Sequence, residues 1–207
     1  TTIYIQFWVG IYMKPSKWIN CMAPAFGPPP KYLAGFFVWS LRGSFKVLTL
    51  AGSISILTGV TEVAAVLLLG LLIDAALMSS PENPLADQIW LFSSGILFFL
   101  LVRPIIFGAT SYVQTVVVSP NIFNLVLSRL HRWSLGHSIK FFENDFAGRI
   151  AQKEMQTSRA LTEVVIEILQ TVLFAFASII GAALILTSVD ILLAILLSIW
   201  IVAYLLM

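Results

Sequence analysis

Few side chains in this 207-residue sequence could do chemistry. Glu163 and Glu167 stand four residues apart, a spacing that puts two carboxylates on one helical face, where they could serve acid–base chemistry or hold a metal. No His, Cys or third carboxylate stands at a supporting spacing, so we expect a solvated face or a partner for Arg159. His131 and His137 are six apart, which is not a metal-ligand spacing. The sequence therefore predicts neither a catalytic residue nor a metal site.

The composition explains why such residues are few. Hydrophobic residues make up 59% of the chain and charged residues only 11%, about half the charge of a typical soluble domain. A membrane-spanning helix needs roughly 20 apolar residues, and several runs of that kind predict an all-α membrane protein. The net charge of +2 gives no indication of nucleic-acid binding. Because the sequence begins at Thr1 and ends at Met207 inside an apolar run, we expect part of a longer protein.

Breaks in the apolar pattern divide the chain into a leader and four predicted spans. Three prolines end the leader, and Lys31 and Arg42 flank a short aromatic segment typical of a helix lying in the membrane interface. Ser119 and Pro120 indicate a cap and a first-turn proline that restart a helix. The predicted segments are a cytoplasmic leader at 1–32, an interfacial helix at 33–43, and a membrane domain at 44–207 with spans at 45–77, 88–118, 147–187 and 191–207.

The second and third predicted spans continue as amphipathic helices outside the bilayer. Apolar residues recur at helical spacing to residue 134, and the return helix has a polar stripe opposite an apolar stripe that includes Ala151, Met155 and Val165. The two helices would be about 69 Å and 59 Å long, whereas the hydrocarbon core takes about 30 Å of each. We therefore expect a paired stalk of long transmembrane helices that extends into water, with a first intracellular loop at 129–160.

The charge distribution predicts which side of the membrane the stalk occupies. All but Arg103 of the twelve Lys and Arg lie before or at the start of the first span, or in the stalk. The two short loops carry only Glu82, Asp87 and Asp190. Since cytoplasmic segments are enriched in Lys and Arg, the N-terminus and the stalk are expected in the cytoplasm.

Arg103 stands well inside the second apolar run, at a depth where an unpaired charge is costly. Glu62 on the neighbouring span could neutralise it, and Glu167 is a second candidate. The pair could form a polar element of a translocation cavity or a gate, or an internal ion pair that fixes helix packing. Pro104 could kink the helix. Close helix contacts are expected at small residues of the first span, Gly52, Gly59 and Gly70.

Three stretches of sequence resemble the transmembrane domain of an ABC exporter of the multidrug type (type 1). "LLGLLIDAAL" at 68–77 resembles the end of that family's first helix, where an Ile-Asp pair is typical. "SPNIFNLVLSRLHRWSLGHSIKFFENDFAGRIAQKEMQ" at 119–156 resembles its first intracellular loop, and the proline-rich leader before "FFVWSLRGSF" is also similar. The resemblance covers about residues 31–207 and implies the N-terminal part of the domain, with four of the family's six helices.

The resemblance implies a partner for the tip of the stalk. A short coupling helix there would contact a nucleotide-binding domain through Ser138, Phe141, Phe142, Glu143, Asp145 and Phe146. ATP and Mg²⁺ would be bound by that domain, because this chain contains no Gly-x-x-x-x-Gly-Lys phosphate loop; no cofactor is expected in the chain itself. The intact protein would be an ATP-hydrolysing permease in the bacterial inner membrane, paired with a second half-transporter, and would move a drug, lipid or peptide.

Two other classes of protein are compatible with parts of the pattern. A membrane signalling or scaffold protein could also use a cytoplasmic helical stalk, to transmit a signal to a soluble partner. An intramembrane enzyme would need a nucleophile and a base, or a metal, at membrane depth, and the sequence offers no such arrangement. The rest of the gene separates a transporter from a signalling protein. A phosphate loop there indicates a transporter, and a histidine-kinase region indicates signalling.

Overall fold

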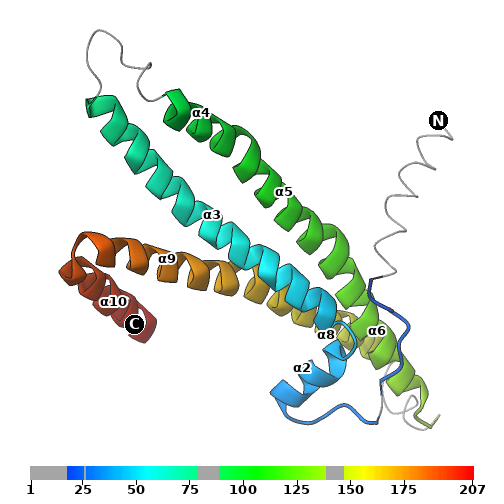
Figure 1. Ribbon diagram of the computed structural model, residues 1–207. Helices are drawn as coiled ribbons and strands as arrows, with labels where there is room; N and C mark the ends of the chain where they lie inside the picture. Colours follow the sequence, from blue (N-terminus) through cyan, green and yellow to red (C-terminus); the bar gives the residue numbers. More distant parts are fainter. Residues whose placement is uncertain (1–17, 26, 79–88, 139–146) are drawn as a thin grey trace, which may run out of the picture. The chain divides into compact units, whose positions relative to one another are not determined.

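The computed structural model describes residues 18–25, 27–78, 89–138 and 147–207 (Figure 1). Within these ranges the chain contains helices and turns and no strand, which confirms the predicted all-α class. Three helical runs are long and apolar enough to cross a bilayer: Phe45–Leu77, Ile89–Leu135 and Gly148–Val189. The structure divides into two compact units, the elbow unit of Thr1–Gly52 with Ser111–Gln170, and the bundle unit of Ser53–Thr110 with Thr171–Met207.

The helices follow one another with few interruptions. Consecutive α-helices and π-helical turns join into the long runs, so that α4 to α6 form one run and α8 to α9 another. In chain order the described elements are α2 (Leu33–Leu41), α3 (Phe45–Met78), α4 (Ile89–Leu97), η2 (Phe98–Val102), α5 (Arg103–Tyr112), η3 (Val113–Val118), α6 (Ser119–Leu135), α8 (Ala147–Glu167), η4 (Ile168–Val172), α9 (Leu173–Val189) and α10 (Ile191–Leu206).

Two of the π-helical turns stand directly before a proline. η2 ends two residues before Pro104, and η3 ends two residues before Pro120. In η3 the Ser119 N–H donates to the carbonyl of Gln114, five residues back. A proline ring collides with the carbonyl four residues back and donates no hydrogen bond, so a wider preceding turn lets the helix continue. α6 begins at Ser119 with Pro120 in its first turn, as the sequence predicts, but Ser119 is not the N-cap, and the helical run Ile89–Leu135 continues through this point without a break.

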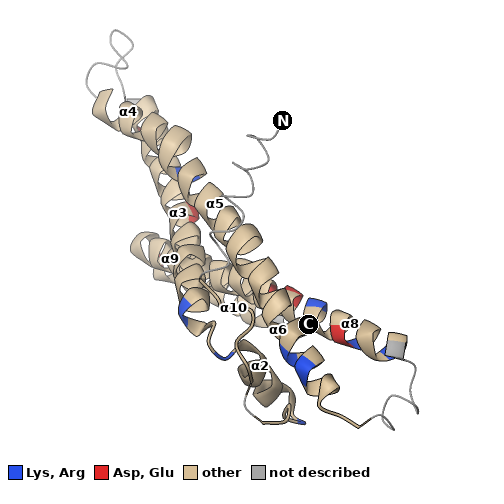
Figure 2. Cartoon of the chain, turned by 90° about the vertical axis from the view of Figure 1, so that its right-hand side faces the viewer, with Lys and Arg blue, Asp and Glu red and all other residues tan. Residues whose placement is uncertain are grey.

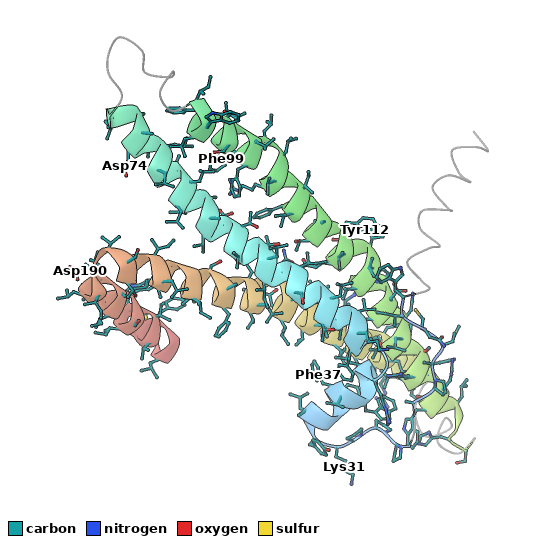
Figure 3. All side chains as sticks on the ribbon, viewed as in Figure 1. Lys31, Phe37, Asp74, Phe99, Tyr112 and Asp190 are labelled. Atoms are coloured by element: carbon teal, nitrogen blue, oxygen red, sulfur yellow. The ribbon has the colours of Figure 1, made fainter. Side chains whose placement is uncertain are left out.

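A single residue separates α9 from α10 in the bundle unit. Asp190 has an extended backbone, with φ −157° and ψ 125°, and its carboxylate accepts a hydrogen bond of 2.9 Å from the Leu192 N–H. This is an N-cap, which satisfies one of the donors left free at a helix start. Asp190 lies at the sharp turn between the two helices (Figure 3), whereas the sequence pattern ended the third span at 187.

In the elbow unit a tight corner joins α2 to α3. Gly43 has a φ of 94°, in the left-handed region that favours glycine. The fully buried Ser44 follows, and its hydroxyl donates to the Leu41 carbonyl at 2.7 Å. The corner therefore turns the chain while its polar groups stay bonded, and α2 becomes a separate short helix before the first long one.

Glycines on two helices of the bundle unit allow close backbone approach. A Cβ added at Gly59 on α3 would lie 2.7 Å from the Phe174 carbonyl oxygen and 2.8 Å from Cβ of Ala177 on α9. A Cβ added at Gly181 on α9 would lie 2.7 Å from a methyl group of Val63 on α3. The predicted close contact at Gly59 is thus present, while a Cβ at Gly70 would meet nothing within 4 Å among the described residues.

We expect Gly59→Ala to lower the stability of the intact protein by about 1 to 3 kcal/mol, because backbone atoms of α9 must shift to admit the methyl group. Gly70→Ala on the same helix is the matched control, and it should be neutral or stabilising by up to about 1 kcal/mol, since alanine favours a helix over glycine. Unfolding in mixed detergent micelles measures both. Equal destabilisation by the two variants would contradict the close contact between α3 and α9.

Candidate functional site

The bundle unit holds an ion pair between α3 and α5. Nη2 of Arg103 lies 2.8 Å from Oε1 and 3.1 Å from Oε2 of Glu62. The guanidinium also stands over the ring of Phe107, 5.7 Å from its centroid, a cation–π distance. Of the two carboxylates considered for Arg103, the structure thus pairs it with Glu62. Glu167 belongs to the elbow unit, where it is exposed on α8.

A second polar contact accompanies the ion pair on the same two helices. The hydroxyls of Thr58 on α3 and Thr110 on α5 lie 2.6 Å apart. Each also lies within hydrogen-bond distance of a backbone carbonyl one turn back on its own helix, at Ile54 and Ile106, so the hydroxyl that does not donate to its neighbour donates to its own helix. Hydroxyls that are satisfied in this way are tolerated in apolar helices. The two contacts make a narrow polar seam between antiparallel helices.

The Arg103–Glu62 pair is accessible within this chain. The side chains are 40% and 35% exposed, so another helix, a substrate or water has access to the charges. The pair lies near the middle of α3, about 24 Å of helix from its end at Met78. The arrangement suits either role considered from the sequence, a polar element of a pathway or a pair that fixes helix packing.

Arg129 of the elbow unit donates hydrogen bonds to four backbone carbonyls. It is 3% exposed and lies on α6. Its guanidinium donates to the carbonyls of Trp39, Ser40 and Arg42, at 2.8, 2.8 and 2.6 Å, and to that of Ala23 at 3.2 Å. The first three carbonyls belong to the C-terminal end of α2, which has no intrahelical donors and carries partial negative charge. Arg129 therefore caps α2 and ties both it and the leader to α6.

The leader is attached to α6 by further hydrogen bonds. The Ser128 hydroxyl donates to the carbonyl of Cys21 at 2.6 Å, and the Cys21 thiol donates to Oδ1 of Asn121 at 3.3 Å. Ile19 is 1% exposed and anchors the segment through apolar packing. Burial raises the pKa of the Cys21 thiol, since the thiolate loses hydration there. Residues 18–25 thus pack as part of the elbow unit.

The buried face of α8 agrees only in part with the predicted apolar stripe: Val165 is buried as predicted, but some other members are not. Met155 is 54% exposed and Ala151 is exposed too, although both belong to that stripe. Glu154 is 9% exposed instead. Its Oε2 lies 3.3 Å from Nδ1 of His131 on α6, the helix against which α8 packs. The buried positions of α8 are Glu154, Ser158, Leu161, Thr162 and Val165, and Leu169 is buried on η4 directly after it.

The predicted polar face of α8 and the predicted coupling segment complete the elbow unit. Arg149, Lys153, Arg159, Glu163 and Glu167 are all exposed. Lys and Arg lie on α6 and α8 and also around α2 and the start of α3 (Figure 2). Ser138 is exposed beyond the end of α6. The other predicted contact residues, Phe141, Phe142, Glu143, Asp145 and Phe146, lie outside the residues that the structure describes.

Sequence reasoning missed the burial of Arg129 and Glu154 in the elbow unit, although the sequence contains a signal for both. Arg129 lies four residues after the buried Leu125, and Glu154 lies seven residues before the buried Leu161. Both charges are thus in helical register with apolar positions instead of on the polar faces of α6 and α8. A charge in register with an apolar stripe predicts burial and a dedicated partner.

One comparison with known proteins gives a match. Over 159 residues the chain is 26% identical to an uncharacterized ABC transporter ATP-binding protein of Haemophilus influenzae. The match covers 74% of this chain and 25% of that protein, so the chain spans about a quarter of its relative's length. No protein-family model and no solved structure matches. The similarity and the three apolar helices together support a membrane protein related to ABC transporters.

Charge-removing variants separate the two roles of the ion pair. Glu62→Gln leaves Arg103 unpaired and should cost about 2 to 3 kcal/mol of stability in the intact protein, because a lone charge in lipid is unfavourable. Adding Arg103→Gln should restore most of that loss. If the double variant also regains the activity of the intact protein, the pair fixes packing; if it is stable but inactive, the charges themselves are needed for that activity. Equal instability of the single and double variants would contradict the pairing.

We expect Arg129→Gln to release α2 and the leader from α6. Exposure then lowers the pKa of Cys21, more thiolate is present at neutral pH, and maleimide should label this residue several-fold faster. The difference in labelling rate between the variant and the unsubstituted protein should shrink as the pH rises above the pKa of Cys21 in both proteins. Arg129→Lys keeps the charge without the forked donors and should fall between the two. Arg159→Gln, on the exposed face of α8, is the control, and faster labelling in that variant would contradict a specific role for Arg129.

Proposed function

We propose that this chain is the N-terminal part of the membrane domain of an ABC exporter that moves amphipathic substrates across a bacterial inner membrane. The observation that carries the proposal is the length of two helical runs. Ile89–Leu135 and Gly148–Val189 contain 47 and 42 residues, about 70 Å and 63 Å of helix. A hydrocarbon core of about 30 Å leaves much of each outside the lipid. The similarity to an ABC transporter protein supports the same assignment.

The excess length belongs to amphipathic helices whose charges are mostly basic. α6 and α8 pack against each other in the elbow unit. Together they carry five Lys and Arg, of which Arg129 is buried and the others are exposed: Arg132, Arg149, Lys153 and Arg159. In this proposal the basic ends stand in the cytoplasm. The segment that joins them, with Phe141 and Phe142 as apolar anchors, contacts a nucleotide-binding domain. ATP and Mg²⁺ are bound by that domain, and a second half-transporter completes the pump.

In this proposal stiff helices transmit motion from the tip of the stalk to the membrane. Closure of nucleotide-binding domains on ATP displaces the tip of the stalk, and the packed helices carry that displacement toward the membrane as rigid elements. The Arg129 contacts with α2 tie the interfacial helix to α6, so the elbow moves with the stalk. The Arg103–Glu62 pair is the polar element nearest to a substrate path in this proposal, and drugs, lipids and peptides all fit the amphipathic class.

A disulfide crosslink tests the contact at the tip. Phe142→Cys, combined with a cysteine on the facing surface of the nucleotide-binding domain of the intact protein, should crosslink on oxidation. Transport stimulated by ATP should stop when the link forms and recover on reduction. Glu163→Cys, on the exposed face of α8, should give no link and is the control. Free maleimide labelling of the cysteine at position 142 throughout the ATPase cycle would contradict the proposal and favour a different partner for the stalk.

A further inference from the structure

The elbow unit contains a cavity of about 530 Å³ between the leader, α6 and α8. Cavities that hold small organic ligands have volumes of roughly 300 to 1,000 Å³. Apolar side chains line it at Met22, Leu127 and Met155, and polar groups reach it from Cys21, His131 and Glu154. The cavity therefore combines apolar walls with a few polar groups, which is the composition of a binding site for a small amphipathic molecule.

Glu154 is the only carboxylate among the residues that line this cavity. Its side chain is 10% exposed, so it has lost most of its hydration, and a carboxylate in that position requires donors. Among the described residues, the side chain that contacts this carboxylate is His131. One contact leaves much of the accepting capacity of the two oxygens unused. The carboxylate is thus available to a donor that enters the cavity.

The contact with His131 is long enough to be replaced. Nδ1 of His131 lies 3.3 Å from Oε2 of Glu154, whereas a charge-assisted hydrogen bond between a nitrogen cation and a carboxylate is about 2.7 to 2.9 Å long. The His131 side chain is 62% exposed and has room to turn toward solvent. A ligand ammonium group could therefore take its place beside the carboxylate at a shorter distance.

Arg132, beside the cavity, favours a ligand with a single positive charge over one with two. Nη2 of Arg132 contacts Sδ of Met22 at 3.4 Å, so a guanidinium stands beside the cavity wall and repels a second cationic group. A metal ion is a poor fit, because no group of three His, Cys, Asp or Glu side chains that could hold one occurs in the described ranges. Met22, Leu127 and Met155 offer soft, adaptable contacts to an apolar body.

We propose that this cavity binds an organic ammonium with an apolar body, whose cationic nitrogen is held by Glu154. The ammonium donates to the carboxylate, and the apolar body lies against the methionine and leucine side chains. The site lies within the elbow unit and contains neither Arg103 nor Glu62, so it is separate from the predicted polar element of the pathway. Binding at this site requires no transport activity.

Protection of Cys21 from maleimide provides a direct test, because this thiol lines the cavity. The intact protein is placed in lipid nanodiscs, and the labelling rate is followed by mass spectrometry of the peptide that contains Cys21. n-Octylammonium should slow labelling about tenfold at ten times its dissociation constant. n-Octanol, which has the same chain and no charge, should need a much higher concentration. Equal protection by the two probes would overturn the proposal.

Three variants locate the charge that recognises the probe. Glu154→Gln should raise the dissociation constant for octylammonium about tenfold, the usual size of a lost charge-assisted contact, and leave that for octanol unchanged. Glu163→Gln, an exposed carboxylate on the same helix, should change neither. Arg132→Gln should strengthen octylammonium binding, since it removes a repelling charge. Equal constants in the Glu154 and Glu163 variants, or no strengthening in the Arg132 variant, would overturn the proposal.

Discussion

Polar groups on apolar helices need partners within the protein, because lipid offers none. Thr58 and Thr61 donate to carbonyls one turn back on α3. Arg103 finds Glu62 on the adjacent helix of the bundle unit. Arg129 on the amphipathic α6 needs partners because it is buried within the protein, and it donates to the free carbonyls at the end of α2. The same requirement determines which helices lie together, since each charge brings its partner's helix close. Apolar packing alone would specify these neighbours less sharply.

Arg129 joins three segments of the elbow unit: α6, α2 and the leader. A guanidinium with planar, forked donors can bind several carbonyls at once, and here it joins α6 to two segments that precede it by about a hundred residues, α2 and the leader. The interfacial helix is therefore attached to the stalk by directional hydrogen bonds. A lysine has the charge but not the geometry for this arrangement. In the proposed exporter, movement of the stalk and of the interfacial helix would be coupled through this one residue.

The prolines of the second run show how a helix accommodates the clash and the lost hydrogen bond of a proline without ending. Pro104 and Pro120 each follow a π-helical turn at the same spacing, and the run of 47 residues stays helical past both. A proline in a helix read from sequence is normally a boundary or a kink. Whether the chain ends the helix there or widens one turn depends on the packing on either side, and the sequence around Ser119 contains no direct sign of that choice.

By itself the sequence determined the all-α class and the positions of the three long apolar helices, since apolar runs of that length leave few alternatives in lipid. It also identified Arg103 and Glu62 as possible partners, because a charge at that depth requires one. Only the tertiary structure decided that Glu62 pairs with Arg103, that Arg129 caps α2, and that Glu154 is buried beside a cavity. Those outcomes depend on which residues of separate helices meet, and periodicity along one helix gives its faces but not the neighbour that each face contacts.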